Sequence, residues 1–499
     1  MTLVSASPVA LAPGTGRTTT WSAAVVATAI GIGLLGASLR FVALLRTGGP
    51  LGMGGYDDGV DYAAAAALVH GRLPYRSFLL LHPPGVVLAA APFAAIGSVF
   101  GDRVGFVAAR LAFEALGGLG AALAFVALRR FGPTAAVTGG VLLAVLPTAV
   151  YAERSVLLEP LGSIGVLLAI VLLGRGTTPG AVFAAGVAAG WAVDVKIWYV
   201  VPAVVLWLAG TRRRGWFAAG AATAVLVVCG PFLAAAPVAM VREVVLDQMG
   251  RARVGRVSRR ITEIVGAIRI GPIDAQLVAG ALLALVLGAL VVTALTAGAR
   301  VFALLLAADL VVLLAAPSWF PHYADLAAPA IALCVGVAAQ RATDLLPAGA
   351  ARRWAAAGLV VAIGVGGTVA ALRAPRGGET VPASVVAAVG RTSGCVVTDD
   401  PTLLAITGVL SRDLADPDCP VRPDVTGWTY DADRAPVPGV PRKANARWQR
   451  DVLGYLLSGR TVIVVRPATG LSSASRARLA ELPVVHATGP WVLRATGRP

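Results

Sequence analysis

Three carboxylates lie close together near the beginning of the chain, at Asp57, Asp58 and Asp61. They follow a pair of glycines and open an Ala-rich run, which predicts a short helix that ends at Gly71. Residues three or four apart are neighbours on a helix, so Asp57 and Asp61 share one face. A helix cap would explain one of these acids but not all three. The spacing therefore indicates an anionic site, in which Asp57 or Asp58 can take the proton from an attacking hydroxyl.

A fourth carboxylate, Glu159, lies in the segment YAERSVLLEP at the end of an apolar run. Ionisable side chains at the edge of a membrane span usually have a function, so we predict that Glu159 belongs to the catalytic site. It would act there as a metal ligand or hold the acceptor. The adjacent residues Glu153 and Arg154 are predicted to form a pair at the surface.

Lys196 lies near the end of another apolar run, where Trp191, Trp198 and Tyr199 surround it like an aromatic belt at a membrane interface. A lysine in this position can face a phosphate group. The alternative is that its ammonium group only extends to the membrane surface.

Two of the four histidines, His82 and His322, fall at the predicted edges of apolar segments. His322, Asp58 and Glu159 would supply oxygen and imidazole ligands that suit Mg²⁺, Mn²⁺ or Zn²⁺, so a divalent cation is a candidate cofactor. His82 can instead bind a donor phosphate. The plainer interpretation is that both histidines only form hydrogen bonds at the interface.

The most basic segment of the chain runs from Arg242 to Arg269, with RARVGRVSRR at its centre. Arginine binds phosphate oxygens in a bidentate manner, so Arg251, Arg253 and Arg256 are predicted to bind the phosphate of a lipid-linked donor. The alternative is a loop that adheres to anionic lipid headgroups without specificity.

The stretch from Tyr56 to Gly85 resembles the first external loop of GT-C glycosyltransferases, and the similarity covers roughly Asp57 to Glu159. The resemblance rests on the acid pair, a Gly-x-x-Pro-Tyr motif that ends at Tyr75, and the His-Pro-Pro-Gly motif that begins at His82. Within that superfamily it is most similar to the protein-mannosyltransferase and lipid A aminoarabinose-transferase group. The resemblance implies a membrane enzyme that takes a sugar from a polyprenyl-phosphate carrier with inversion, and it places the general base at Asp57. It also implies that Lys196, which matches a recurrent position of the family, faces the donor phosphate. Relatives often have Glu-Lys where this chain has Leu81-His82, so their acid and lysine are absent here.

The composition places the chain among polytopic membrane proteins. Of its 499 residues, 57% are apolar and 14% are charged, and the mean hydropathy is +0.79. The net charge of +16 is scattered between apolar windows, which favours membrane lipids and a phosphorylated lipid over nucleic acid as partners. No P-loop or Gly-x-Gly-x-x-Gly motif opens a helix, which disfavours nucleotide-driven chemistry.

The predicted fold is mainly α-helical, with a disordered cytoplasmic tail over residues 1–20 and a transmembrane domain over residues 21–373. About 11 apolar segments are long enough to be considered as spans. They lie near residues 21–45, 104–128, 135–151, 156–173, 181–193, 197–209, 216–236, 277–297, 301–316, 326–339 and 355–372. Residues 85–100 are predicted to form an interfacial helix. The positive-inside rule then places the acidic loop and the C-terminus outside the cytoplasm, although the segment from Arg242 to Arg269 falls on that same side against the rule.

Residues 374–499 are predicted to form a small external α/β domain. CVVTDD and TVIVV are typical of buried strands, PTLLAITG and residues 472–482 of helices, and the last apolar stretch of a hairpin. Cys395 and Cys419 are the two cysteines outside apolar windows, and we predict that they form a disulfide.

The leading functional prediction is a glycosyltransferase of the plasma membrane that acts on an extracytoplasmic glycan, lipid or protein acceptor. The composition is typical of a high-GC bacterium, for which mannose and arabinofuranose are candidate sugars. A flippase or transporter of lipid-linked sugars is the competing class, but transporters place charges near the membrane midplane rather than in an external loop. A non-catalytic scaffold for envelope assembly is the third possibility.

Overall fold

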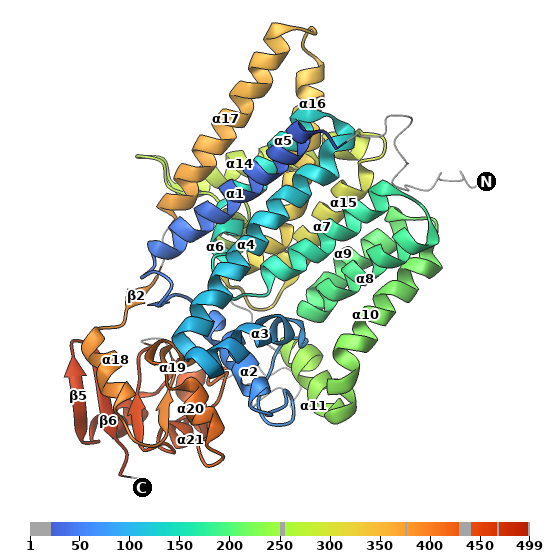
Figure 1. Ribbon diagram of the computed structural model, residues 1–499. Helices are drawn as coiled ribbons and strands as arrows, with labels where there is room; N and C mark the ends of the chain where they lie inside the picture. The colour runs from blue at the N-terminus through green and yellow to red at the C-terminus, as the bar shows by residue number, and fades with distance from the viewer. Residues whose placement is uncertain (1–20, 250–254, 375–376, 429–440, 467–468, 498–499) are drawn as a thin grey trace.

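The computed structural model describes residues 21–249, 255–374, 377–428, 441–466 and 469–497. A long helical bundle is joined at one end to a small sheet covered by helices (Figure 1). The bundle is formed by α1 (Ala23–Leu45), α4 (Asp102–Leu128), α5 (Pro133–Val145), α6 (Pro147–Ala152), α7 (Glu159–Arg175), α8 (Pro179–Val195), α9 (Val200–Val205), α10 (Arg214–Ala235), α14 (Ala275–Leu295), α15 (Arg300–Ala315), α16 (Ala328–Asp344) and α17 (Ala350–Arg373). All the apolar segments predicted as spans are mainly helical.

Within the described ranges, six helical segments are long and apolar enough to cross a membrane. They are residues 23–45, 102–131, 214–235, 275–295, 321–344 and 350–373. The other predicted spans are shorter in the structure, so the total of about 11 crossings stays a prediction. A helix is the natural form for such segments, because a bilayer offers no partner to an unpaired backbone amide or carbonyl.

Small residues allow close packing between α1 and α4 at the centre of the bundle. A Cβ atom added to Gly118 in α4 would lie 2.5 Å from the carbonyl oxygen of Gly33 in α1. Glycine at this position therefore lets two backbones approach, as is common between helices in membranes.

The loop after α1 forms α2 (Tyr56–Val69) and α3 (Gly85–Phe100), which lie between the bundle and the C-terminal sheet (Figure 1). Gly71 follows α2 with φ of 79°, in agreement with the predicted end of that helix. Helix α3 confirms the predicted short helix, and Pro92 lies inside it.

The basic segment is more ordered than the predicted loop. It follows α11 (Pro237–Val241) and contains a π-helical turn (Arg242–Leu246), α12 (Asp247–Met249) and α13 (Val257–Ile264). The buried Arg260 side chain donates hydrogen bonds to the carbonyls of Leu313 (3.0 Å) and Ala316 (2.6 Å) and thereby caps the end of α15. At least one arginine of this segment therefore has a structural role.

The C-terminal part forms a four-stranded sheet with the strand order β3-β4-β6-β5. Strand β3 (Val396–Thr398) pairs in parallel with β4 (Thr461–Ile463), and β6 (Trp491–Ala495) is antiparallel to both β4 and β5 (Val484–Thr488). Helices α18 (Ala383–Gly390), α19 (Pro401–Thr407), α20 (Leu410–Ala415), α21 (Ala446–Leu456) and α22 (Ser473–Ala480) accompany the sheet. The predicted strands, helices and final hairpin are thus confirmed. A short pair between β1 (Gly52–Met53) and β2 (Glu379–Thr380) was not expected from the sequence.

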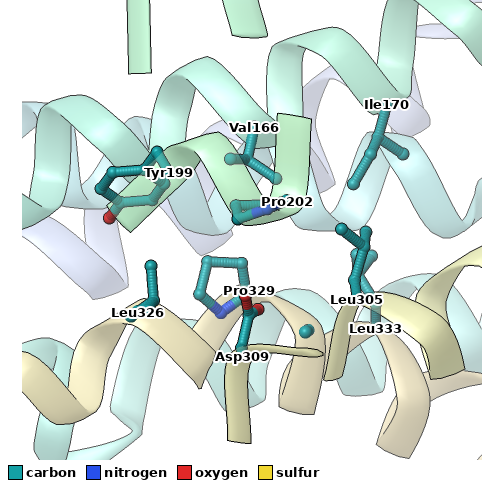
Figure 2. A pocket seen from close by; sticks show the side chains of 10 residues that line it. Val166, Ile170, Tyr199, Pro202, Leu305, Asp309, Leu326, Pro329 and Leu333 are labelled. Atoms are coloured by element: carbon teal, nitrogen blue, oxygen red, sulfur yellow. The ribbon is translucent and has the colours of Figure 1, made fainter. Parts of the chain in front are cut away.

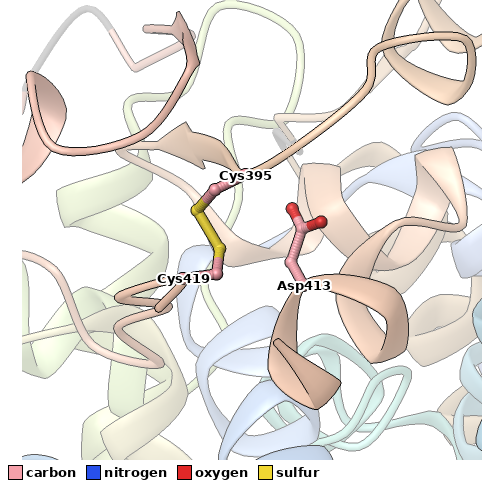
Figure 3. Close-up of side chains that lie close together, drawn as sticks. All are labelled: Cys395, Asp413 and Cys419. Carbon is pink, nitrogen blue, oxygen red and sulfur yellow. A yellow bond between two sulfur atoms is a disulfide. The ribbon is translucent and has the colours of Figure 1, made fainter. Parts of the chain in front are cut away.

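The predicted disulfide joins Cys395 to Cys419, with 5.3 Å between their Cα atoms (Figure 3). Asp413 lies beside it and accepts hydrogen bonds from the Val396 amide (3.0 Å) and the Arg412 guanidinium (2.8 Å). Because both sulfur atoms are bonded to each other and the carboxylate is occupied, this cluster is a structural link and not a metal site.

We expect Cys395 and Cys419 to resist alkylation in the unreduced, detergent-solubilised protein, whereas denaturation after reduction should expose both thiols. Loss of the crosslink should lower the stability of the C-terminal part by about 3 kcal/mol, because the crosslink restricts the unfolded chain. Mass spectrometry of labelled peptides with and without reductant measures this directly. Labelling of both cysteines without reductant would contradict the disulfide.

Candidate functional site

The two adjacent acids at the start of α2 have different environments. Asp58 is fully buried, and its Oδ2 accepts hydrogen bonds from Nε (3.1 Å) and from a terminal nitrogen (2.5 Å) of Arg110 in α4. Burial raises the pKa of Asp58, and the Arg110 guanidinium opposes this rise. The Asp57 side chain, by contrast, is 44% exposed, and its Oδ2 lies 3.7 Å from Nε2 of His322. Asp57 is therefore open to a substrate while Asp58 fixes the helix.

Asp61 lies one helical turn after Asp57 and is buried. Burial raises its pKa well above the usual value, and the charges of Asp57, Glu159 and Asp58 raise it further. These interactions show that the carboxylates predicted from separate parts of the sequence are gathered in one region.

Glu159 begins α7 and is buried in an ion pair with Lys196, which ends α8. The Lys196 ammonium lies 2.7 Å from Oε1 of Glu159 and also contacts the aromatic rings of Trp198 and Tyr323, at 4.8 Å and 4.1 Å from their centroids. The two side chains thus neutralise each other's charge. The predicted contact of Lys196 with a donor phosphate stays a prediction.

His322 brings the loop before α16 to the first turn of α2. Its ring is stacked on Phe320, with 5.8 Å between the centroids, and meets the edge of Tyr323. Tyr323 in turn packs against Trp198 beside Lys196. This chain of contacts connects the Asp57 side of the site to the Glu159 side.

The Pro-Tyr motif shapes the loop that carries His82. Tyr75 is the only non-glycine residue with a positive φ, 64°, in the described part of the chain. Its hydroxyl donates a 2.7 Å hydrogen bond to the carbonyl of His82, which is half-buried. Strained backbone at a motif that the sequence already singled out supports a functional constraint on this loop.

One prediction about this region is wrong: Glu153 and Arg154 do not form a surface pair. Both are buried, and Glu153 forms an ion pair with Arg40 of α1, which also donates to the carbonyls of Ala144 (3.0 Å) and Leu143 (3.3 Å). The side chains of adjacent residues point in different directions on a turn. Glu153 therefore contacts Arg40, and Arg154 packs over the ring of Tyr151.

Arg110 and Arg40 are the site's supporting residues that were not predicted. Each is a charged residue inside a predicted apolar segment, and such residues usually have a buried partner. That signal was present in the sequence, but the partner could not be read from it.

Of the three arginines predicted to bind phosphate, the structure describes Arg256. Arg256 is exposed and directly precedes α13. Arg251 and Arg253 lie outside the described residues, so their role stays a prediction.

The predicted metal ligands are not gathered into a ligand set in the structure. Among the described residues, the one group of three or more acidic, histidine or cysteine ligand atoms within 4.8 Å of each other is the disulfide cluster of Cys395, Asp413 and Cys419. Asp58 and Glu159 instead contact Arg110 and Lys196, and a cation would have to compete with both. The arrangement does not fit a metal ion unless these side chains rearrange.

A small cavity lies deeper in the bundle, between α7, α9, α15 and α16 (Figure 2). Its volume is about 10 Å³, room for about one water molecule, so it cannot hold a sugar. Asp309 is its acidic lining residue, and Tyr199 connects it to the site because its hydroxyl donates to the Glu159 carbonyl (3.4 Å).

Comparison with solved structures places this fold beside lipid-dependent transferases. The aminoarabinose transferase ArnT from Cupriavidus metallidurans, solved with undecaprenyl phosphate, superposes with a TM-score of 0.58 at 18% identity over 96% of this chain and 98% of ArnT. The oligosaccharyltransferase AglB from Archaeoglobus fulgidus, solved with an inhibitory peptide and a dolichol-phosphate, gives a TM-score of 0.53 at 13% identity over 89% of this chain and 70% of AglB. No known family and no curated protein matches the sequence. The chain thus has the GT-C fold that its first loop resembles.

Proposed function

We propose that this protein is a membrane glycosyltransferase that moves a sugar from a polyprenyl-phosphate donor to an acceptor on the extracytoplasmic side. The fold supports this assignment, since ArnT was solved with undecaprenyl phosphate and AglB with a dolichol-phosphate. The single observation that carries it is the division between the two first-turn acids. The Asp58 carboxylate is held in a buried ion pair with Arg110, whereas the Asp57 carboxylate is partly exposed at the edge of a buried charged region.

In the proposed reaction, Asp57 accepts the proton of the acceptor hydroxyl while the oxygen forms a bond with the anomeric carbon. The bond between that carbon and the donor phosphate oxygen breaks, and its electron pair leaves with the phosphate. Direct displacement inverts the anomeric configuration. His322, whose Nε2 lies 3.7 Å from Oδ2 of Asp57, is placed to orient the carboxylate.

The Glu159–Lys196 pair is proposed to form the opposite wall of the site. Lys196 and His82 are candidates to meet the donor phosphate, and Glu159 is a candidate to hold the acceptor. A divalent cation at Asp58, Glu159 and His322 stays a proposal that requires the side chains to move. Mannose and arabinofuranose are the candidate sugars, and a panel of purified polyprenyl-phosphate sugars distinguishes them.

A flippase for lipid-linked sugars is the second candidate function. Asp309 favours it, because this buried acid lies within α15 beside a cavity the size of a water molecule. Buried ionisable groups inside membrane helices are common in transporters. The clustered acids at α2 favour transfer chemistry over this alternative.

We expect Arg256→Ala to weaken donor binding about tenfold, since one charge-assisted contact with phosphate contributes on the order of 1.4 kcal/mol. Arg251→Ala and Arg253→Ala should act in the same way. Turnover at saturating donor should change little, because these contacts are made equally in the ground and transition states. Titration with a polyprenyl phosphate in nanodiscs measures the affinity. Arg478→Ala, at an exposed pair in α22, is the control, and an equal loss there would contradict a specific phosphate site.

A further inference from the structure

We infer that the C-terminal part of the chain is a clamp that positions Asp57, because it contacts helix α2 at two places in the first turn and also contacts the chain just beyond the end of the helix. The inference rests on the proposed function in one respect, the role of Asp57 as the base. It assigns positioning roles to Tyr56, Asp424 and Arg466, none of which is needed to contact a substrate.

The first contact is made at Tyr56, the residue before Asp57. Its hydroxyl donates a 2.7 Å hydrogen bond to Oδ1 of Asp424 and accepts hydrogen bonds from the amides of Val425 (2.9 Å) and Thr426 (3.2 Å). The guanidinium of Arg466 lies 3.7 Å from the centroid of the Tyr56 ring. One side chain in the first turn of α2 is thus fixed by two segments of the C-terminal part.

The second contact is a close approach in the middle of the turn. A Cβ atom added to Gly59 would lie 2.0 Å from Oγ1 and 2.6 Å from the amide nitrogen of Thr402 in α19. Glycine at this position therefore lets the start of α19 pack directly on the backbone of α2.

The third contact lies beyond the end of α2, where Arg72 donates hydrogen bonds to the carbonyls of Leu414 (2.9 Å), Asp416 (3.0 Å) and Cys419 (3.2 Å). The nearby helix α20 is also tied to the bundle. The Ser411 amide and hydroxyl donate to the Asp102 carboxylate of α4 at 3.0 Å and 2.5 Å.

Two links inside the C-terminal part make the three contacts act together. The Asp399 carboxylate accepts hydrogen bonds from the backbone amides of Val465 (2.7 Å) and Arg466 (3.1 Å). These two bonds connect the start of α19 to the segment that carries Arg466. The Cys395–Cys419 disulfide connects β3 to the segment that binds Arg72. A displacement of α2 would therefore have to break contacts in several connected segments.

A clamp of this kind matters for catalysis because a base must lie within hydrogen-bond reach of the proton it removes. A shift of about 1 Å in a catalytic group can lower a rate on the order of 100-fold. The structure thus assigns the C-terminal part a share in turnover, separate from any contact with the acceptor.

The test is Tyr56→Phe, which keeps the ring beneath Arg466 but removes the three hydrogen bonds of the hydroxyl. We expect kcat to fall about 10- to 100-fold with less than a twofold change in the KM for the donor, together with faster hydrogen exchange of the amides of α2. Asp424→Ala should behave like Tyr56→Phe. Asp424→Asn should recover most of the activity, because its amide oxygen can still accept the same hydrogen bonds.

Tyr455→Phe is the matched control. Its hydroxyl accepts a hydrogen bond from the Arg422 amide (3.4 Å), its ring lies under the Arg422 guanidinium, and it belongs to a separate hydrophobic cluster inside the C-terminal part. An equal fall in kcat for Tyr455→Phe, or unchanged kcat and exchange for Tyr56→Phe, would overturn the clamp. If the wild type transfers no sugar, the proposed function fails, and hydrogen exchange of α2 still decides whether the clamp exists.

Discussion

Replacing Asp57 by asparagine is expected to lower the turnover of sugar transfer by about 10²- to 10⁴-fold, while donor binding changes little. The amide keeps the size of the side chain and its place beside His322, but it cannot accept the proton of the acceptor hydroxyl. Because the Asp57 side chain is 44% exposed, the substitution should leave folding intact.

The measurement is single-turnover transfer with purified protein in nanodiscs and a polyprenyl-phosphate sugar. Asp418→Asn is the matched control, since it makes the same chemical change at an exposed acid of the C-terminal part. Full turnover of Asp57→Asn would refute the assignment of the base, and Asp58 would become the next candidate.

The second large effect is expected for Arg110→Met, which should destabilise the protein by roughly 3–5 kcal/mol. Methionine has a side chain of similar length but no charge, so the buried Asp58 carboxylate loses its cationic partner. It also removes the hydrogen bonds to the carbonyls of Pro50 (2.8 Å) and Gly52 (2.9 Å) that hold the chain before α2.

A double-mutant cycle separates the ion pair from the packing. Arg110→Met combined with Asp58→Asn should be less destabilised than Arg110→Met alone, because no charge is then left buried. Thermal unfolding monitored by tryptophan fluorescence ranks the stabilities of the wild type, the single variants and the double variant. Arg478→Met removes an exposed pair with Glu481 and should have a small effect. A melting temperature for Arg110→Met equal to that of the wild type would contradict the structural role of the pair.

Local patterns were enough to predict most elements. The Ala-rich run after the acid pair became α2, and the apolar segments became the helices of the bundle. The Pro and Gly residues that frame PTLLAITG mark the first turn and the end of α19, with Gly408 at a φ of 75°. Capping, turn and periodicity signals act over a few residues, so they can be read directly from the sequence.

The partners within the site could not be predicted, because they are brought together by the tertiary fold. Tyr56 and Asp424 are 368 residues apart, and Arg40 and Glu153 are 113 residues apart. Their pairing depends on which helices become neighbours. The predicted surface pair of Glu153 with Arg154 failed for this reason, since adjacency along the chain was taken for adjacency in space.

The role of the C-terminal part was underestimated in the same way. Its strands and helices were predicted, but as an external domain with no stated contact. In the structure, Leu403, Leu404 and Ile406 of α19 share one hydrophobic core with Tyr62 of α2 and Phe106 of α4. The predicted domain boundary was placed where the apolar segments of the sequence end. Such a boundary does not show whether the residues after it pack onto the loop between the first two spans.

The central claim is that this protein transfers the sugar of a polyprenyl-phosphate donor to an acceptor hydroxyl. Sealed proteoliposomes test this claim most directly. The donor carries a radiolabelled sugar and is added to the outer leaflet together with a water-soluble acceptor. The account predicts label in the acceptor with wild-type protein and almost none with Asp57→Asn. Movement of intact labelled donor to the inner leaflet, equal in both proteins and without any labelled acceptor, would contradict it and establish a flippase instead.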